Sequence, residues 1–242
     1  MSNRPRVAVF RPADERIEQA QTLLSELGVE TVADPMLELH PTENSPRTDA
    51  EYTILTSKTG VELVAEMNWR PDGLLCAIGE PTATALETAG YDVDIVPDTF
   101  SSTGLVNRLA DEVSGARIEV ARSNHGSPVL LDGLEAEGAY LHETVLYELT
   151  RPHDAGISAE QAAAGELDGA LFTSSLTVTH FCEAATERGV REEAIAGLNA
   201  GVVGAIGQPT AETARDAGID VAVVPDDAEF EALARAVVSR LR

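Results

Sequence analysis

The sequence predicts an α/β protein built from two flavodoxin-like parallel-sheet domains, and a repeated phrase is the first reason. The segments 78–98 and 206–226 share Ile-Gly-x-Pro-Thr-Ala, then Ala-Gly, then Val-Pro-Asp, with an offset of 128 residues and no insertion. Each copy has the pattern of a buried strand, a glycine turn, a helix opened by proline, a glycine stop and another strand. A repeat of this length suits two copies of one α/β domain.

The second reason is the order of the remaining elements. Residues 7–10 and 29–33 read as strands around a helix at 14–27, and an extended segment at 35–41 is bracketed by prolines. The middle of the chain holds five expected strands, at residues 52–55, 74–78, 93–96, 118–121 and 140–149. Three more are expected near the end, at residues 170–172, 202–206 and 221–224.

The third reason is the strand count. Neither the first block nor the last has enough strands for a stable sheet covered on both faces, but together they have as many as the middle block. We therefore expect an outer domain of residues 1–36 and 151–242 with a second domain, residues 37–150, inserted into it. The crossings near 33–41 and 145–152 are expected to pair as a two-stranded β-ladder. Right-handed crossovers then give strand order 2-1-3-4-5 in each sheet.

Composition excludes several classes of function. The formal net charge is −24 and Lys58 is the only lysine, which argues against nucleic acid and anionic membranes as partners and indicates adaptation to molar salt. No secretory signal or membrane span is expected, so we predict a cytoplasmic protein. Cys76 and Cys182 stand alone on a predicted strand and helix, so the pattern predicts neither a metal site nor a disulfide framework.

Four small polar turns follow predicted strands, and each opens a helix. They are Thr56-Ser57-Lys58, Gly79 with Thr82, Thr173-Ser174-Ser175, and Gly207 with Thr210. Ligands bind at the carboxyl ends of strands in doubly wound sheets, and helix N-termini suit carboxylates or phosphates. The turns therefore predict a multi-anion cleft between the domains. Ser and Thr are also common N-caps, which is the purely structural alternative.

Further candidates lie beside these turns. Lys58 is a candidate anion contact because the sequence has no other lysine. Arg11, Arg122 and Arg151 end predicted strands and could bind a carboxylate, or could pair with the many Asp and Glu residues. Tyr147 lies mid-strand on the face of Val145 and Leu149, where β-propensity alone would explain it. If its strand borders the cleft, its hydroxyl could donate a proton.

The motifs of nucleotide-binding, covalent and metal enzymes are missing from the sequence. An enzyme with this sequence is expected to work without cofactor or metal.

The chain resembles the uroporphyrinogen-III synthase family over nearly its whole length. The matching positions, in order, are Arg11-Pro12, Pro35, Thr56-Ser57, Ile78-Gly79 with Thr82-Ala83, Arg122-Ser123, Val145 with Tyr147, Phe172-Thr173-Ser174, and Ile206-Gly207 with Thr210-Ala211. The resemblance implies two flavodoxin-like domains joined by a β-ladder. It also implies a cofactor-free reaction in which hydroxymethylbilane, a linear tetrapyrrole, closes to uroporphyrinogen III with inversion of ring D.

The resemblance also implies residue roles. Tyr147 matches the tyrosine proposed in the family to help the terminal hydroxyl leave, and a phenol with a pKa near 10 is protonated at neutral pH. Thr82, Ser123, Ser174 and Thr210 match positions thought to contact substrate. Our further substrate-binding candidates are Arg11, Thr56, Ser57, Lys58, Gly79, Arg122, Ser175 and Gly207. The family is usually monomeric, so the resemblance implies a monomer, with transient hand-off from hydroxymethylbilane synthase as a further expectation.

Two other functions remain open from the sequence. A two-domain binding or sensor protein for a carboxylate or phosphate ligand would share this architecture. An enzyme acting on a phosphate ligand, such as a nucleotide-sugar epimerase, would use similar helix-end sites but needs nucleotide signatures that the sequence lacks.

Overall fold

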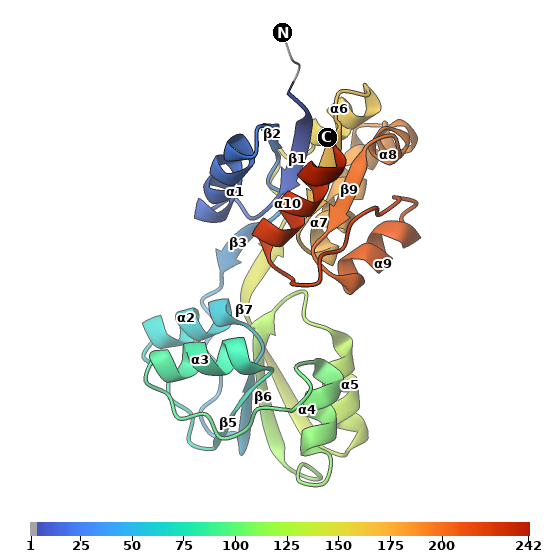
Figure 1. Cartoon of the computed structure of the whole chain (residues 1–242). Helices are drawn as coiled ribbons and strands as arrows, with labels where there is room; N and C mark the ends of the chain where they lie inside the picture. Colours follow the sequence, from blue (N-terminus) through green and yellow to red (C-terminus); the bar gives the residue numbers. More distant parts are fainter. Residues whose placement is uncertain (1–3) are drawn as a thin grey trace. The chain divides into compact units, whose positions relative to one another are not determined.

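The computed structural model describes residues 4–242 and divides the chain into two compact units (Figure 1). The outer unit comprises the chain up to Leu39 and the segment Thr150–Arg242, and the inner unit is His40–Leu149. The sequence placed these boundaries at 36/37 and 150/151, a few residues away.

The outer unit contains a parallel sheet in the order β2-β1-β8-β9. Its strands are β1 (Arg6–Phe10), β2 (Glu30–Ala33), β8 (Gly169–Phe172) and β9 (Val202–Ala205). The strand predicted at 221–224 is only an isolated bridge from Val223 to Gly204. This segment lies at the sheet edge with one neighbour, and Pro225 follows it without an N–H to continue the ladder.

The inner unit contains a sheet in the order β3-β7-β6-β4-β5. Its strands are β3 (Glu38–Pro41), β4 (Tyr52–Leu55), β5 (Leu74–Ala77), β6 (Arg117–Ser123) and β7 (Tyr140–Thr150). The pairs β4–β5, β4–β6 and β6–β7 are parallel. The strand predicted at 93–96 is again reduced to one bridge, from Ile95 to Cys76. The two predicted crossing segments, β3 and β7, are neighbours in this sheet.

The predicted order 2-1-3-4-5 is correct for the outer sheet when the Val223 bridge is counted as its fifth member. It is wrong for the inner sheet, whose parallel members in chain order (β4, β5, the Ile95 bridge, β6, β7) are arranged 3-2-1-4-5. If the numbering starts at β6 and continues through β7, β4, β5 and the Ile95 bridge, the order in the sheet becomes 2-1-3-4-5. The inner domain is thus a circular permutant of the outer arrangement. The repeated phrase conceals this, because it covers only one strand–helix–strand unit.

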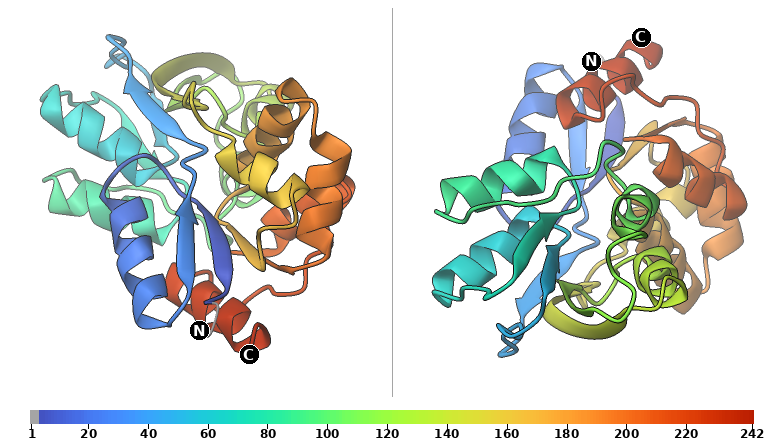
Figure 2. Two further views of the ribbon diagram at one scale, coloured as in Figure 1. Left: turned by 90° about the horizontal axis from the view of Figure 1, so that it is seen from above. Right: turned by 90° about the horizontal axis from the view of Figure 1, so that it is seen from below.

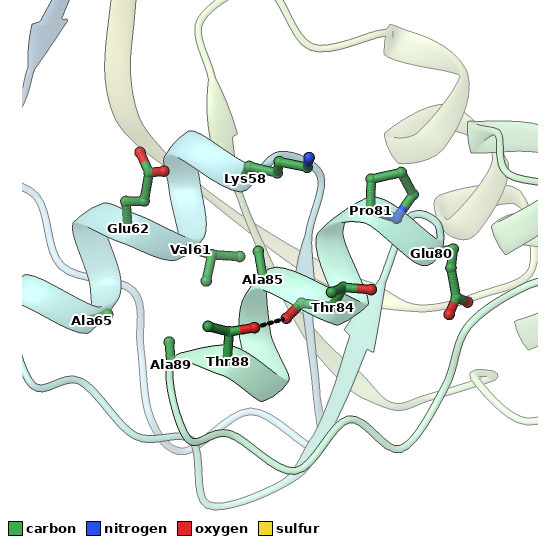
Figure 3. A pocket seen from close by; sticks show the side chains of 10 residues that line it. All are labelled: Lys58, Val61, Glu62, Ala65, Glu80, Pro81, Thr84, Ala85, Thr88 and Ala89. Carbon is green, nitrogen blue, oxygen red and sulfur yellow. Dashed lines mark hydrogen bonds between the residues drawn. The ribbon is translucent and has the colours of Figure 1, made fainter.

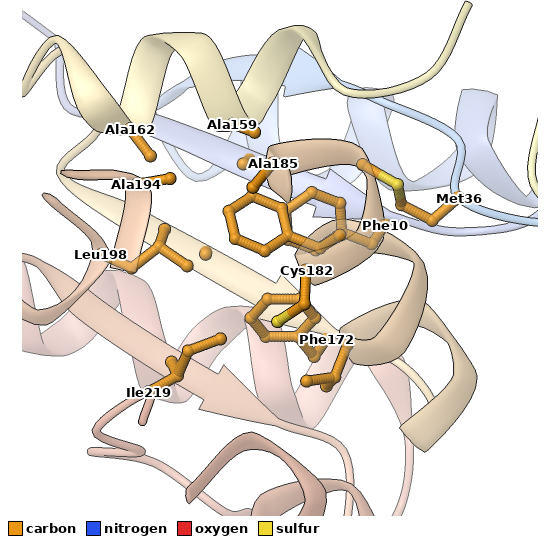
Figure 4. Packing of buried hydrophobic residues seen from close by; sticks show 14 of the residues in the cluster. Phe10, Met36, Ala159, Ala162, Phe172, Cys182, Ala185, Ala194, Leu198 and Ile219 are labelled. Atoms are coloured by element: carbon orange, nitrogen blue, oxygen red, sulfur yellow. The ribbon is translucent and has the colours of Figure 1, made fainter. Parts of the chain in front are cut away.

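Helices cover both faces of the outer sheet, as the alternation of β1 requires. Val7 and Val9 pack against α1 (Glu15–Glu26) and α10 (Phe230–Arg240). On the opposite face Phe10 and Phe172 stack with ring centroids 4.6 Å apart, within the cluster drawn in Figure 4. The helices that supply the rest of that cluster are α6 (Ile157–Ala163), α7 (Ser175–Glu187), α8 (Arg191–Asn199) and α9 (Gln208–Asp216).

The inner sheet is covered in the same way. One face packs its apolar residues against α4 (Ser102–Leu109) and α5 (Pro128–Ala136). The other two helices, α2 (Lys58–Glu66) and α3 (Glu80–Thr88), lie side by side in both views of Figure 2. Gly60 lies inside the first turn of α2. No helix within residues 4–242 is long and apolar enough to cross a membrane.

A buried carboxylate joins the start of the first crossing segment to the segment that follows the second. Asp34 is 2% exposed and accepts hydrogen bonds from Gly156 N at 2.9 Å and from both the backbone N and the hydroxyl of Ser158. Gly156 has φ of 114°, and a Cβ there would lie 2.9 Å from the Cβ of Ala184. Asp34 therefore completes the start of α6, which no side chain caps from within the helix.

Replacing Asp34 by alanine should lower the free energy of unfolding by about 2–4 kcal/mol, because several buried donors lose a charged acceptor. The midpoint of urea unfolding at fixed salt measures this. Asp154→Ala, an exposed change in the same unit, is the matched control and should leave the midpoint within error. Equal midpoints for the two variants would contradict the role given to Asp34.

The two cysteines should be unreactive in the folded protein. Burial raises the pKa of the Cys76 thiol to about 12 and, to a smaller degree, that of Cys182. At pH 8 the thiolate fraction of Cys76 is then on the order of 10⁻⁴. Ellman's reagent should label neither thiol in native buffer and both in urea. Rapid labelling of the native protein would contradict this prediction.

Candidate functional site

The inner sheet has a polar hollow at its carboxyl edge, with a volume of about 260 Å³. It lies where β4, β5 and β6 end, as expected for a doubly wound sheet. Five residues predicted from the sequence line it: Thr56, Ser57, Arg122, Ser123 and Tyr147. Parallel pairing brings them together, because it aligns the strand ends although the residues are far apart in the chain.

Tyr147 reaches this hollow through a β-bulge. On β7 the residues Leu146 and Tyr147 together oppose the single residue Ser123 of β6. The strict alternation expected from Val145 to Leu149 is therefore interrupted, and Leu146 and Tyr147 are both buried, at 0% and 6% exposure. The bulge also lets Tyr147 O accept the backbone N–H of Asn124, which fixes the turn after β6.

A pair of hydroxyls forms one wall of the hollow. Tyr147 Oη donates to Ser57 Oγ at 3.0 Å, and Ser57 Oγ also accepts the N–H of Gly60 at 3.0 Å as the N-cap of α2. A serine hydroxyl has two acceptor positions and one proton. With both acceptor positions in use, Ser57 can act toward a further partner only as a donor.

Arg122 is engaged within the protein. Its guanidinium is nearly inaccessible, with Nε donating to Glu143 Oε1 at 2.6 Å and Nη1 donating to the carbonyl of Ser127 at 2.6 Å. A Cβ at Gly126 would lie 2.4 Å from Arg122 Cδ, so glycine leaves room for the arginine. Arg122 therefore holds the turn that carries Ser123, and a substrate carboxylate would have to compete with Glu143.

Lys58 and Thr82 lie outside this hollow. Lys58 is exposed at the start of α2 and belongs to a separate groove of about 600 Å³ between α2 and α3 (Figure 3). Thr82, in the first turn of α3, is 4% exposed. The N-cap of α3 is Gly79, and no side chain caps that end of the helix.

The outer sheet presents its own turns at the carboxyl ends of the adjacent strands β1, β8 and β9. Ser174 caps α7 in a capping box with Thr177, and Ser175 is the first residue of the helix. Gly207 begins α9 without a side-chain cap, and Thr210 is 4% exposed. In the serine turns the serine hydroxyl already accepts a hydrogen bond from the helix that it caps. The two glycine turns, at α3 and α9, leave first-turn N–H groups without side-chain partners among the described residues.

Arg11 is the most distinctive group on the outer edge. Its guanidinium carbon lies 4.5 Å from the centroid of the Phe230 ring, and its buried Nε has no hydrogen-bond partner among the described residues. Burial lowers the pKa of Arg11, and the neighbouring Arg16 lowers it further, while Asp14 opposes the shift. A buried donor without an acceptor favours an incoming anion. Arg151 also has a buried Nε without a hydrogen-bond partner among the described residues, but its Nη2 donates to Glu187.

The sequence missed several residues of the inner hollow. Ser102, His125 and Ser127 line it as well, and His125 Nε2 lies 3.1 Å from the carbonyl oxygen of Leu149. Ser127 could have been found, because it precedes Pro128 in an N-cap pattern. Nothing in the local sequence marks the other two. Within residues 4–242 no three His, Cys, Asp or Glu side chains are grouped as metal ligands.

Comparison with known proteins gives a family match over most of the chain. The family model described as uroporphyrinogen-III synthase HemD matches residues 18–235. The chain belongs to the uroporphyrinogen-III synthase family.

Two proteins named as members of this family are similar to the chain in sequence. A protein of Methanothermobacter thermautotrophicus, provisionally named uroporphyrinogen-III synthase, is 32% identical over 91% of this chain and 92% of its own length. The uroporphyrinogen-III synthase of Synechococcus elongatus is 32% identical over 56% of this chain and 54% of its own.

Solved structures of the family share the fold. A mutant uroporphyrinogen III synthase of Thermus thermophilus superposes with a TM-score of 0.74 at 19% identity, covering 98% of both chains. The enzyme of Helicobacter pylori gives a TM-score of 0.59 at 18% identity over 99% of this chain and 100% of its own.

Proposed function

We propose that this chain converts hydroxymethylbilane to uroporphyrinogen III, closing the tetrapyrrole ring with inversion of ring D and without a cofactor. Family membership supports the reaction class. We assign the chemistry to particular atoms because the Tyr147–Ser57 hydroxyl pair lies in the wall of the inner hollow.

The first step would be loss of the terminal hydroxyl. The C–O bond breaks heterolytically, the pyrrole nitrogen supplies the electron pair, and the oxygen leaves as water after receiving one proton. We propose that Ser57 donates toward the leaving oxygen while Tyr147 supports it from behind, with the phenol as the general acid of the pair.

The remaining steps would depend on geometry. The substituted carbon of ring D attacks the azafulvene to give a spiro intermediate, which fragments and recloses in the opposite sense, and a proton is finally lost. One water is released for each substrate consumed. Holding a flexible chain in one conformation is the protein's main contribution, since reactive ends at the right distance gain several orders of magnitude.

The substrate's carboxylate arms would be bound by helix N-termini and one arginine. We assign this to the turns at Gly79 and Gly207, whose helices lack side-chain caps, and to Arg11 with its free Nε. For Thr82 and Thr210 we propose that the backbone of the first helical turn, and not the buried side chain, makes the contact. Hydroxyl contacts are proposed for Thr56, Ser123, Ser174 and Ser175, and charge contacts for Lys58 and Arg122.

We further propose that the protein acts in the cytoplasm as a monomer adapted to molar salt, with transient hand-off from hydroxymethylbilane synthase. Its charge of −24 with a single lysine supports the salt adaptation.

The proposed reaction is tested directly by incubating the purified protein with freshly made hydroxymethylbilane and separating the product isomers. Type III product formed faster than spontaneous closure supports the proposal. Type I product alone, at the rate seen without protein, would overturn it and favour the binding or sensor function.

Tyr147→Phe should lower kcat about a hundredfold, at the low end of general-acid contributions, with little change in KM. Ser57→Ala should lower kcat similarly, and the double variant should be no worse than either, because the two hydroxyls act as one chain. Steady-state kinetics measures all three. Tyr140→Phe, on the same strand but 70% exposed, is the control and should behave as wild type. Full turnover by Tyr147→Phe would remove Tyr147 from the acid role.

Raising KCl from about 0.1 M to about 2 M should increase kcat/KM about tenfold, because screening shortens the range over which a protein of charge −24 repels a polyanionic substrate. Sucrose at matched osmolality is the control and should not replace the salt. Full activity in dilute buffer would contradict the proposed salt adaptation.

A further inference from the structure

Phe100 is an exposed aromatic residue in the connection between α3 and α4. Its side chain is 59% exposed, in a chain with only 4% aromatic residues. Burial of an aromatic side chain stabilises a fold, so a phenylalanine left largely in water gives up part of that contribution. An exposed aromatic side chain can contact a ligand when its position is fixed and a ligand site is close.

The position of Phe100 is fixed from two sides. A Cβ placed on Gly79 would lie 2.9 Å from the Cβ of Phe100 and 3.0 Å from its Cγ, so the Phe100 side chain packs directly on the glycine backbone. Gly79 has φ of 178°, which any residue can adopt. Its lack of a side chain is therefore explained by room for Phe100 and not by backbone conformation.

The backbone around Phe100 is also held. Ser101 N donates to the carbonyl of Thr99 at 2.8 Å, and Ser101 Oγ caps α4 by accepting the N–H of Gly104 at 3.0 Å. A Cβ on Gly104 would lie 1.9 Å from the oxygen of Thr99, so the turn closes tightly on itself. Phe100 is thus presented to solvent by a short, capped turn.

This aromatic residue adjoins the polar hollow. Ile78, which precedes Gly79, lines the hollow, and so does Ser102, two residues after Phe100. Phe100 is not itself a lining residue, but it packs on Gly79, which follows the wall residue Ile78, and it precedes the wall residue Ser102 by two positions. The ring is therefore attached through its chain neighbours to the wall of the cavity that contains Ser57 and Tyr147.

We propose that Phe100 is a positioning residue that contacts the face or edge of a pyrrole ring of the substrate, and this rests on the proposed function. A linear tetrapyrrole combines flat, electron-rich rings with carboxylate arms. Polar groups of the hollow can bind the arms, but they cannot fix the orientation of a ring face. A rigid aromatic side chain beside them does so, because ring pairs favour offset-stacked or edge-to-face arrangements.

The outer domain has no aromatic residue at the position that corresponds to Phe100. Ala228 stands 128 residues after Phe100, and a Cβ on Gly207 would meet nothing closer than Pro209 Cδ at 3.9 Å. The aromatic contact therefore belongs to the inner domain alone. This asymmetry suits a substrate whose terminal ring must be treated differently from the other three.

The test compares Phe100→Ala, Phe100→Leu and Phe100→Tyr with wild type, using hydroxymethylbilane as substrate. We expect Phe100→Ala to raise KM about tenfold and to increase the fraction of type I product, because a loosely held ring closes without inversion. Phe100→Tyr should restore both values, and Phe100→Leu should fall between. Leu74→Ala, an apolar residue 40% exposed at the amino end of β5, is the matched control and should match wild type.

A second variant connects Phe100 to Gly79. Gly79→Ala should displace the ring and raise KM and the type I fraction as Phe100→Ala does, because the added Cβ would lie 2.9 Å from the Cβ of Phe100 and 3.0 Å from its Cγ. Urea midpoints of the Phe100 variants should fall only slightly below that of wild type, since the side chain is 59% exposed. Unchanged KM and isomer ratio in Phe100→Ala would overturn the inference while wild type still forms type III product. Type I product from wild type would instead overturn the proposed function.

Discussion

The register between β6 and β7 is the constraint on which the candidate site depends. Parallel pairing runs in step from Arg117 opposite Tyr140 to Arg122 opposite Val145, and then slips by one residue so that Ser123 faces Tyr147. Without that slip Ser123 would face Leu146, and the Tyr147 hydroxyl would not be placed at Ser57. A bulge beside a functional site is a common way to redirect one side chain without disturbing the rest of a sheet.

The groups around this bulge have two roles, because some stabilise the turn and others line the hollow where chemistry is proposed. Arg122, although cationic and buried, pairs with Glu143 and with the Ser127 carbonyl, so it stabilises the turn after β6. Ser57 and Tyr147 form a hydroxyl pair in the wall of the hollow. The proposed azafulvene intermediate suits this division, because a nearby free carboxylate would be drawn to the electrophile.

The two domains reuse one arrangement with different starting points. The outer sheet has the order 2-1-3-4-5 along its own chain, and the inner sheet has the same order only after permutation. Both domains keep a glycine N-cap at the corresponding helix, at Gly79 and Gly207, without a side-chain cap. They differ in what packs on that glycine, since Phe100 packs on Gly79, whereas among the described residues nothing comes closer than 3.9 Å to a Cβ placed on Gly207.

The sequence by itself determined the α/β class, the parallel sheets and most strand positions, because short apolar runs between glycine turns depend on local pattern. It also placed Thr56, Ser57 and Ser123 near strand ends, which parallel pairing then brought to one edge, whereas Tyr147 was placed mid-strand and reaches that edge through the bulge. Only the tertiary structure decided that residues 93–96 and 221–224 form single bridges, because an edge segment has one neighbour to pair with. It also decided the permuted order of the inner sheet, the internal pairing of Arg122, the burial of Thr82 and Thr210, and the place of Phe100 on Gly79. Each of these depends on contacts between segments distant in the chain, which local propensity does not encode.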